Sequence, residues 1–445
     1  MLVAQKEVEA PEQLLERLSQ ARVRTDEIFS IVNADSLYER PIPERHRIIF
    51  YLGHLEAFDW NLLRERVLDM KPFAADLDKL FAFGIDPVNG SLPTDQPADW
   101  PSVASTHSYV GRIRESIDAA LATLDSSEWN STRAGTDYSA SKLLNVAIEH
   151  RLMHAETLAY MLHQLPLERK VRKGRATPTV SPIAPKMIEI PAGRATLGMS
   201  RQDGAFGWDN EFEAQTVDVP AFAIDKYKVT NRQYLHFITA GGYENPEFWT
   251  EEDWDWRTSH DIRLPVFWIQ KNDRWYFRTM FDEIPLSMDW PVYVSHAEAS
   301  AYTRWANKSL PTEGQWHRAA YGTANNVDRL FPWGDETPDA SKGNFDFQSW
   351  DPTPVNGFPD GDSAFGVADL LGNGWEWTSS KFEPFPGFQR FSFYPGYSAD
   401  FFDGKHYVMK GASPRTAACM LRRSFRNWFQ PHYQYVYAGF RCVSK

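Results

Sequence analysis

Two histidines stand four residues apart in residues 149–157, which read EHRLMHAET. In an α-helix this spacing places His150 and His154 on the same face, where both imidazoles can bind one metal ion. Two ligands do not complete a metal site. A third histidine, His54, lies in the apolar segment FYLGHLEAF. If a second helix carries His54 toward the pair, three neutral imidazoles converge and leave other positions on the metal open.

The alternative interpretation is structural, since a helical histidine pair also suits a surface or a hydrogen-bonded core. Imidazole binds Zn, Cu, Fe and Ni, so the ligand type does not select a metal. Glu156 follows His154 by two residues, about 200° around a helix, and we expect it to point away from the pair. The zinc-protease motif HEXXH is absent. The spacing alone leaves both interpretations, metal site and structural core, open.

Four segments with apolar residues at three- and four-residue spacing would position these histidines. They are residues 12–32, 45–68, 101–124 and 139–165. We expect a four-helix bundle over residues 10–165, with His54 on its second helix and the pair on its fourth. The second and third segments are joined by residues 83–101, a loop rich in proline, glycine and aspartate. A loop of this length inside a compact domain is often functional.

Residues 166–185 are basic and then rich in proline, serine and threonine, which predicts a linker. Residues 186–445 follow a different pattern, with short apolar runs and many tryptophan, glycine, proline and asparagine residues. Strands are predicted at 187–200, 213–230, 267–277 and 407–413, and short helices at 229–242 and 295–309. The sequence therefore predicts a multidomain protein, a helical bundle followed by an α+β domain.

The formal net charge of −12, from 47 basic and 59 acidic residues, repels a phosphate backbone and predicts no nucleic-acid partner. The first residues, MLVAQKEVEAPEQ, turn charged too early for a secretory signal, and no run of about 18 apolar residues could span a bilayer. The two cysteines, Cys419 and Cys442, cannot form a disulfide framework. We expect a cytoplasmic protein with no membrane partner. No pattern indicates an oligomeric state.

Both halves resemble known families. The bundle resembles the DinB-like fold, and HRLMHAE resembles the H-x3-H-x-E motif of the ergothioneine-biosynthesis sulfoxide synthases. The second half resembles the C-type-lectin-like domain of formylglycine-generating enzymes and sulfatase-modifying factors. The stretches that carry this second resemblance are MIEIPAGRATLGMS, KVTNRQYLHFI, WPVYVSHAEASAYTRWANKSLPTEGQWHRAA, FPWGDE, ADLLGNGWEWTSS and YAGFRC. The order of the two domains is typical of the sulfoxide synthases.

The resemblance implies an oxidoreductase that binds Fe(II) through His54, His150 and His154 and uses O2 as a co-substrate. Such enzymes join C2 of hercynine, a trimethylhistidine, to the sulfur of a small donor and give an S-linked sulfoxide. The implied partners are therefore small molecules, hercynine and a thiol or selenol. An open iron site that holds both reactants brings them together in a reactive orientation, so they need not meet by diffusion.

The resemblance also implies residues in the second domain. SFRNWFQ is similar to the family's RNW segment, which places Asn427 and Trp428 at the hercynine site, where an amide can hydrogen-bond and an indole face can hold a trimethylammonium group. For Trp428 the alternative is core packing. FYPGYSADFF is similar to the segment with an active-site tyrosine, so Tyr394 or Tyr397 is the candidate proton donor, with Tyr394 preferred.

Two departures from the family pattern concern the sulfur donor. Phe429 follows Trp428 where the γ-glutamylcysteine branch has aspartate, and Met153 precedes His154 where one branch has glutamine. No arginine occurs between Arg66 and Arg112, although a dipeptide with two carboxylates calls for paired cations. With Met153 and Phe429 as substrate contacts, we expect cysteine rather than γ-glutamylcysteine, and a selenol or thiosugar stays an alternative.

Two further alternatives follow from the second domain. A related iron enzyme could form another C–S or C–Se bond, as a selenoneine synthase does, and a lectin-like domain on a structural bundle could be a noncatalytic binding module. The copper-binding cysteine pair of a formylglycine-generating oxidase is disfavoured. Cys419 and Cys442 lie 23 residues apart, and that function would leave the three histidines unexplained.

Overall fold

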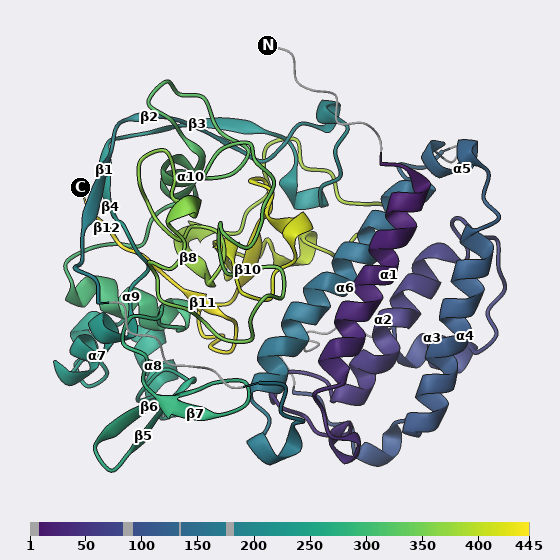
Figure 1. Cartoon of the computed structure of the whole chain (residues 1–445), viewed down its shortest axis with the longest axis horizontal. Helices are drawn as coiled ribbons and strands as arrows, with labels where there is room; N and C mark the ends of the chain where they lie inside the picture. The colour runs from purple at the N-terminus through teal and green to yellow at the C-terminus, as the bar shows by residue number, and fades with distance from the viewer. Residues whose placement is uncertain (1–8, 83–91, 133–134, 175–181, 445) are drawn as a thin grey trace. The chain divides into compact units, whose positions relative to one another are not determined.

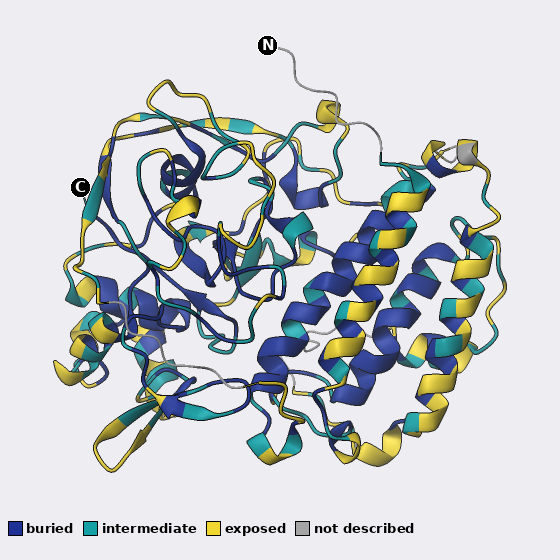
Figure 2. Ribbon diagram, in the orientation of Figure 1, coloured by how far each residue is buried: buried dark blue, intermediate teal, exposed yellow. Residues whose placement is uncertain are grey.

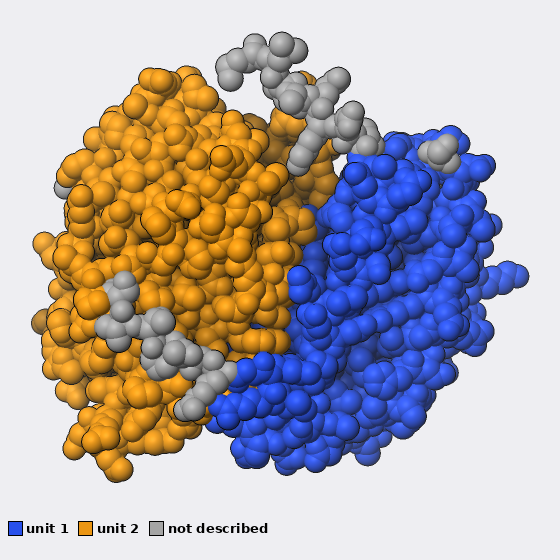
Figure 3. All heavy atoms as spheres, viewed as in Figure 1, with its two compact units in different colours: residues 1–174, 391–393 blue, residues 175–390, 394–445 orange. Residues whose placement is uncertain are grey.

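The computed structural model describes residues 9–82, 92–132, 135–174 and 182–444. It divides the chain into two compact units, coloured separately in Figure 3: residues 1–174 with 391–393, and residues 175–390 with 394–445. Unit 1 is helical, and unit 2 combines short strands, short helices and long connections (Figure 1). Among the described residues, no helix has both the length and the apolar character needed to traverse a bilayer.

Four long helices form unit 1. They are α1 (Pro11–Phe29), α2 (Ile48–Leu63), α4 (Val103–Leu121) and α6 (Ala140–His163), and the short helices are α3 (Ala75–Leu80) and α5 (Ser126–Asn130). Local signals start them: Pro11 opens α1, and the side chains of Ser102 and Ser139 accept from backbone N–H groups in the first turns of α4 and α6. Helix α1 packs on α6, and α2 packs on both α4 and α6.

The long helices differ in how they are buried. Figure 2 shows α1 and α4 with one buried stripe each and exposed outer faces, as expected for amphipathic surface helices. Helices α2 and α6 are buried on nearly every side. Both nevertheless carry ionisable residues inside, among them His54, Glu56 and Asp59 on α2, and His150, Arg151 and His154 on α6. Because buried polar groups need partners, these six side chains mark the part of unit 1 that requires explanation.

The predicted loop at 83–101 and the predicted linker at 166–185 are each described only in part. Residues 83–91 of the predicted loop lie outside the described residues, as do residues 175–181 of the predicted linker. The first part of that linker is ordered on unit 1: Leu167–Arg169 form a 3-10 helix, and Lys170 is buried and pairs with Val32 in an isolated bridge.

Unit 2 contains four small sheets in its described part. Their strand orders are β1-β4-β12, β2-β3, β5-β6-β7 and β10-β9-β8-β11. The strands are β1 (Met187–Ile190), β2 (Gly193–Leu197), β3 (Gln215–Val219), β4 (Phe222–Asp225), β5 (Trp268–Lys271), β6 (Arg274–Arg278), β7 (Glu283–Pro285), β8 (Gly374–Lys381), β9 (Tyr407–Ala412), β10 (Asn427–Phe429), β11 (Ala438–Gly439) and β12 (Val443–Ser444). The helices are α7 (Asn231–Thr239), α8 (Glu251–Ser259), α9 (His296–Trp305) and α10 (Glu313–Tyr321).

A buried ion cluster holds these small elements together. Glu376 on β8 accepts from Arg441 Nε at 2.6 Å and Nη2 at 2.7 Å, and from the Trp316 indole on α10 at 3.0 Å. Lys228 Nζ lies 3.3 Å from the same carboxylate. Burial by itself raises the pKa of the Glu376 carboxyl, but Arg441 and Lys228 outweigh burial and hold that pKa below its ordinary value. The cluster thus joins β8, α10 and the carboxyl-terminal segment without relying on long strands.

We predict that Arg441→Met destabilises unit 2 by about 3–5 kcal/mol, because it leaves a buried carboxylate with too little compensating charge. Chemical denaturation followed by tryptophan fluorescence measures the effect. The matched control is Arg263→Met, which removes an exposed pair with Asp261 and should leave the midpoint unchanged. An unchanged midpoint for Arg441→Met would show that the cluster does not hold the unit together.

Candidate metal centre

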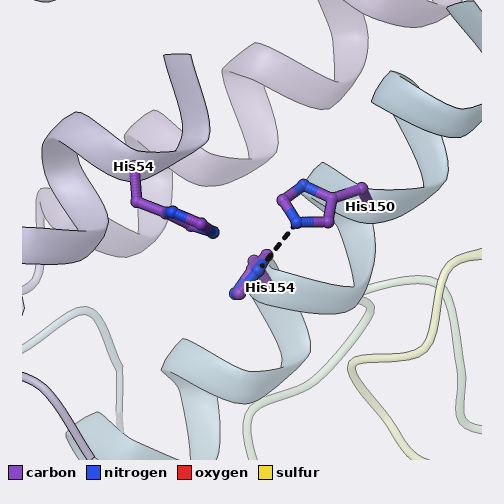
Figure 4. Close-up of side chains that lie close together, drawn as sticks. All are labelled: His54, His150 and His154. Carbon is purple, nitrogen blue, oxygen red and sulfur yellow. Dashed lines mark hydrogen bonds between the residues drawn. The ribbon is translucent and has the colours of Figure 1, made fainter. Parts of the chain in front are cut away.

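Three histidines from two helices of unit 1 meet at one point. One ring nitrogen from each of His54, His150 and His154 lies within 4.8 Å of the other two, and all three residues are buried (Figure 4). The Nε2 atoms of His150 and His154 are 3.1 Å apart. Three imidazole nitrogens at about 2.1 Å from one ion lie roughly 3–4 Å from each other. The cluster therefore has dimensions that a single metal ion can occupy with small adjustments.

The helices bring these residues together in a simple way. His150 and His154 are one turn apart on α6, and α2 packs on α6 so that His54 faces the pair, its ring centroid 4.9 Å from that of His154. In the described part of the chain, this is the one group of three histidine, cysteine, aspartate or glutamate side chains with such spacing. Glu156, expected to point away from the pair, is also buried on α6.

The hydrogen bonding of His54 assigns its tautomer. Its Nδ1 lies 2.7 Å from the carbonyl oxygen of Phe81, and a carbonyl can only accept, so Nδ1 carries the proton. The lone pair of the neutral ring is then on Nε2, a buried atom with no hydrogen-bond partner in the structure. A backbone carbonyl that orients the far nitrogen is the usual arrangement behind a metal-binding histidine. The residues present fit a bound metal ion.

The carbonyl is brought there by α3. Asp78 on this helix accepts from the Trp60 indole at 3.2 Å and from the Tyr109 hydroxyl at 2.7 Å, which fixes α3 against α2 and α4. Gly53 then lets the Phe81 ring approach α2, since a Cβ at position 53 would lie 2.5 Å from that ring. A larger residue at position 53 would collide with the Phe81 ring. The close approach of Phe81 to α2 places its carbonyl oxygen against Nδ1 of His54 and so orients the imidazole.

Burial keeps all three imidazoles neutral. It lowers the pKa of His54 to about 4, although the bond to the Phe81 carbonyl opposes the shift. Burial also lowers the pKa of His150 and of His154 well below the ordinary value, and electrostatic repulsion from His54 and Arg151 acts in the same direction on both. Neutral imidazole is the form that binds metal, so protons do not compete for the site near neutral pH.

Two phenylalanine rings of α2 flank the cluster. Phe58 stacks on His150 with centroids 3.4 Å apart and planes 11° from parallel, and Phe50 stacks on His54 at 4.8 Å and 24°. Each lies one turn from His54, on opposite sides of it. The rings restrict the rotation of the imidazoles and present apolar surface to the site. Both phenylalanines were missed from the sequence, although their spacing of four residues from His54 was a usable signal.

The predicted residues of the carboxyl-terminal half form an aromatic group within unit 2. The Tyr397 ring is 5.6 Å from that of Tyr394 and 5.5 Å, edge to face, from that of Trp428. Phe382 stacks on Trp428 with ring centroids 4.1 Å apart. The structure therefore brings the two candidate tyrosines and Trp428 together. Trp428 is half-buried, so it combines packing with an accessible surface.

Other predicted residues are placed differently. Asn427 and Phe429 flank Trp428 on β10 and project to the opposite face of the strand. The Asn427 side chain accepts from the backbone N–H of Trp428 at 2.9 Å, and Phe429 stacks on Tyr433 at 4.9 Å. Met153, in unit 1, is half-buried beside His154 on α6.

A buried turn before β3 supports the tyrosines and was not predicted. Trp208 stacks on Tyr397 with centroids 3.9 Å apart, and the next residue, Asp209, accepts from the Ser398 hydroxyl at 2.6 Å. Both Asp209 and Ser398 are fully buried. This bond ties residues 394–398 to a distant part of the chain. The sequence GWDNE gives no periodic signal, because the turn contains only a 3-10 helix.

We predict that His154→Ala abolishes stoichiometric Fe(II) binding while the helical content of the protein is retained, since the change removes one of three ligands from a packed bundle. Anaerobic titration with Fe(II) and metal analysis after desalting measure it. His107→Ala, which removes an exposed histidine on α4, is the matched control and should bind as the unchanged protein does. Retention of one tightly bound Fe(II) in His154→Ala would contradict the ligand assignment.

Comparison with known families agrees with this architecture. Residues 17–158 match the DinB superfamily, and residues 174–445 match the sulfatase-modifying factor enzyme 1-like domain. The predicted fold class is confirmed: a DinB-like helical domain precedes an α+β domain of the formylglycine-generating-enzyme type.

Several relatives share most of this length. Hercynine oxygenase from Mycolicibacterium smegmatis is 32% identical over 98% of this chain and 99% of its own. The enzyme of the same name from Mycobacterium tuberculosis is 35% identical over 77% of this chain and 78% of its own. Ergothioneine biosynthesis protein 1 from Neurospora crassa is 28% identical over 92% of this chain and 55% of its own. The resemblance to the ergothioneine-biosynthesis enzymes is thereby confirmed, and this chain belongs to the hercynine oxygenase family.

Proposed function

We propose that this protein is a non-heme Fe(II)- and O2-dependent sulfoxide synthase. It would join C2 of hercynine to the sulfur of a small thiol in ergothioneine biosynthesis. The observation that carries the proposal is the buried cluster of three neutral imidazoles, found in a chain that belongs to the hercynine oxygenase family. A noncatalytic lectin-like module would have no use for such a cluster, because the buried Nε2 atom of His54, which has no hydrogen-bond partner, costs free energy unless it binds something.

His54, His150 and His154 would hold the iron. When bound, Fe(II) supplies one-electron chemistry with O2 and a single point at which substrates are held together. Three neutral ligands leave the full charge of the metal uncompensated, which favours binding of an anionic thiolate. They also leave coordination positions free, as a site for more than one reactant requires.

The chain's own residues have distinct tasks in this proposal. Phe50 and Phe58 hold the imidazole planes and keep water from the apolar side of the cluster. A tyrosine hydroxyl carries its proton at neutral pH, so Tyr394 or Tyr397 can give a proton to a reacting oxygen atom. Trp428 offers an indole face of the kind that attracts a trimethylammonium cation. Asn427 and Met153 are the further proposed contacts to hercynine.

The donor we propose is cysteine. Phe429 packs on Tyr433 and brings no charge to the segment after Trp428, which argues against a grip on a second carboxylate and amine. We also propose a cytoplasmic location, in which the amino acid cysteine is available, because Cys419 and Cys442 do not form a disulfide with each other.

We predict O2 uptake when the iron-loaded protein receives hercynine and cysteine together, with a product whose mass equals the coupled pair plus oxygen. Parallel reactions with γ-glutamylcysteine and with a selenosugar test the donor, and hercynine alone is the control. An oxygen electrode measures the O2 uptake, and mass spectrometry identifies the product.

The outcomes separate the alternatives. Turnover with γ-glutamylcysteine alone would overturn the donor assignment, and a coupled product without added oxygen would favour the selenium-type enzyme. An iron-loaded protein that consumes no O2 with any donor would contradict the proposed reaction.

We further predict that Tyr394→Phe diverts the reaction toward oxidation of the thiol alone while iron binding is unchanged, because the variant lacks the proposed proton donor but keeps the ring. The measurement is the ratio of coupled product to oxidised thiol, with Tyr397→Phe as the matched control. If Tyr397→Phe and not Tyr394→Phe changes this ratio, the role belongs to Tyr397.

A further inference from the structure

Arg151 lies between two of the metal-site histidines in sequence, yet its side chain points into the bundle and is completely buried. Its guanidinium donates to Glu56 Oε1 at 2.9 Å and Oε2 at 2.7 Å, and to Asp59 Oδ2 at 2.6 Å. It also donates to the backbone carbonyl of Leu55 at 3.3 Å. One side chain of α6 thus contacts three residues within about one turn of α2, the helix that carries His54.

The arrangement has a fixed geometry. A guanidinium that meets both oxygens of one carboxylate forms two parallel bonds in a plane, and this fork restrains rotation as well as distance. Glu56 is two residues after His54 and Asp59 five, so both carboxylates belong to the same stretch of helix as the ligand. The bonds therefore determine how far α2 lies from α6 and how it is turned about its axis.

Stability alone does not account for these charges. Taking three charged groups out of water costs free energy, and well-packed apolar side chains in the same space often stabilise a fold equally well or better. Buried ion pairs do have a clear use where a particular register must be selected. Here α2 and α6 both carry proposed metal ligands. A metal site tolerates errors in ligand distance of only about 0.2 Å, so the separation of these two helices matters.

We propose that Arg151, with Glu56 and Asp59, is a set of positioning residues that places His54 opposite His150 and His154 at the separation a metal ion requires. The three residues do not bind the metal. Their effect passes through the relative placement of α2 and α6. This inference rests on the proposed metal site, but it does not depend on which substrates the enzyme uses.

The wider network supplies a control. Glu56 also accepts from Arg114 on α4 at 2.8 Å, and Arg114 pairs with Asp26 on α1, so Glu56 keeps a partner when Arg151 is changed. A second pair, Arg22 on α1 with Asp118 on α4 at 2.7 Å, involves no residue of α2 or α6, although the positive charge of Arg22 also acts on the carboxylates of Glu56 and Asp59. Breaking the Arg22 pair therefore changes a nearby charge in the bundle but leaves the bonds between α2 and α6 in place.

The test uses the full chain and Fe(II) or Co(II) alone. The combined variant R151M/E56Q/D59N removes the buried charges together, so no carboxylate is left without a partner, and it should fold with a denaturation midpoint close to that of the unchanged protein. We expect its Fe(II) affinity to fall about 10- to 100-fold, as is typical when groups behind metal ligands are lost. The EPR spectrum of the bound Co(II) should broaden and change shape. R22M/D118N should leave affinity and spectrum unchanged.

Arg151→Lys keeps the charge and loses the fork, and it provides a second, milder variant. We expect a folded protein with at least several-fold weaker Fe(II) binding and an altered Co(II) spectrum. Unchanged Fe(II) affinity and an unchanged Co(II) spectrum in either folded variant would overturn the positioning role. If R22M/D118N lost as much Fe(II) affinity as the Arg151 variants, the effect would come from general destabilisation of the bundle, and the positioning role would also be overturned. Failure of the unchanged protein to bind Fe(II) would instead refute the metal site itself.

Discussion

A polar group withdrawn from water must find a partner inside the protein, and in unit 1 this constraint acts on two groups of ionisable side chains that α2 and α6 bring together. Arg151 donates hydrogen bonds to both Glu56 and Asp59. The Nδ1 atom of His54 is satisfied by a backbone carbonyl, and its Nε2 atom is left facing two other imidazoles. That atom is a buried acceptor with no hydrogen-bond partner, and its ring lies beside the His150 and His154 imidazoles. A core that leaves such a lone pair beside two further imidazoles is organised to bind a cation.

Unit 2 is held together by other interactions than unit 1. Its strands are short, so ladder hydrogen bonds alone cannot hold its long connections. Buried charges such as Glu376 with Arg441, and stacked rings such as Trp208 with Tyr397, fix those connections instead. Aromatic side chains suit this task, because they bury a large area with few rotatable bonds and still present faces or hydroxyl groups at a surface. The same property would let Trp428 and the two tyrosines serve a small cationic substrate.

Much of the architecture could be predicted because it follows from periodicity. Helices α1, α4 and α6 show apolar residues at helical spacing and serine or proline at their starts, and the order of the two domains identified the family. The three histidines could be nominated because a spacing of four residues has a definite meaning on a helix. Their roles stay predictions, as do those of Tyr394, Tyr397 and Trp428.

Other features had no signal that sequence reasoning could use. The Phe81 carbonyl is a backbone group that any residue would supply, so only the approach permitted by Gly53 makes it special. Arg151 looks like an exposed helix residue until its acidic partners on α2 are placed beside it. Asp209 and Ser398 are nearly two hundred positions apart, and their contact arises from tertiary structure in loops that have no period.

X-ray absorption at the iron edge, on protein loaded with Fe(II) without O2, tests the central claim most directly. The account predicts three imidazole nitrogens at about 2.1 Å, with remaining light-atom scattering from exchangeable ligands and no sulfur before the thiol is added. A first shell with fewer than three imidazoles, or one that contains protein sulfur, would show that His54, His150 and His154 do not hold the metal together.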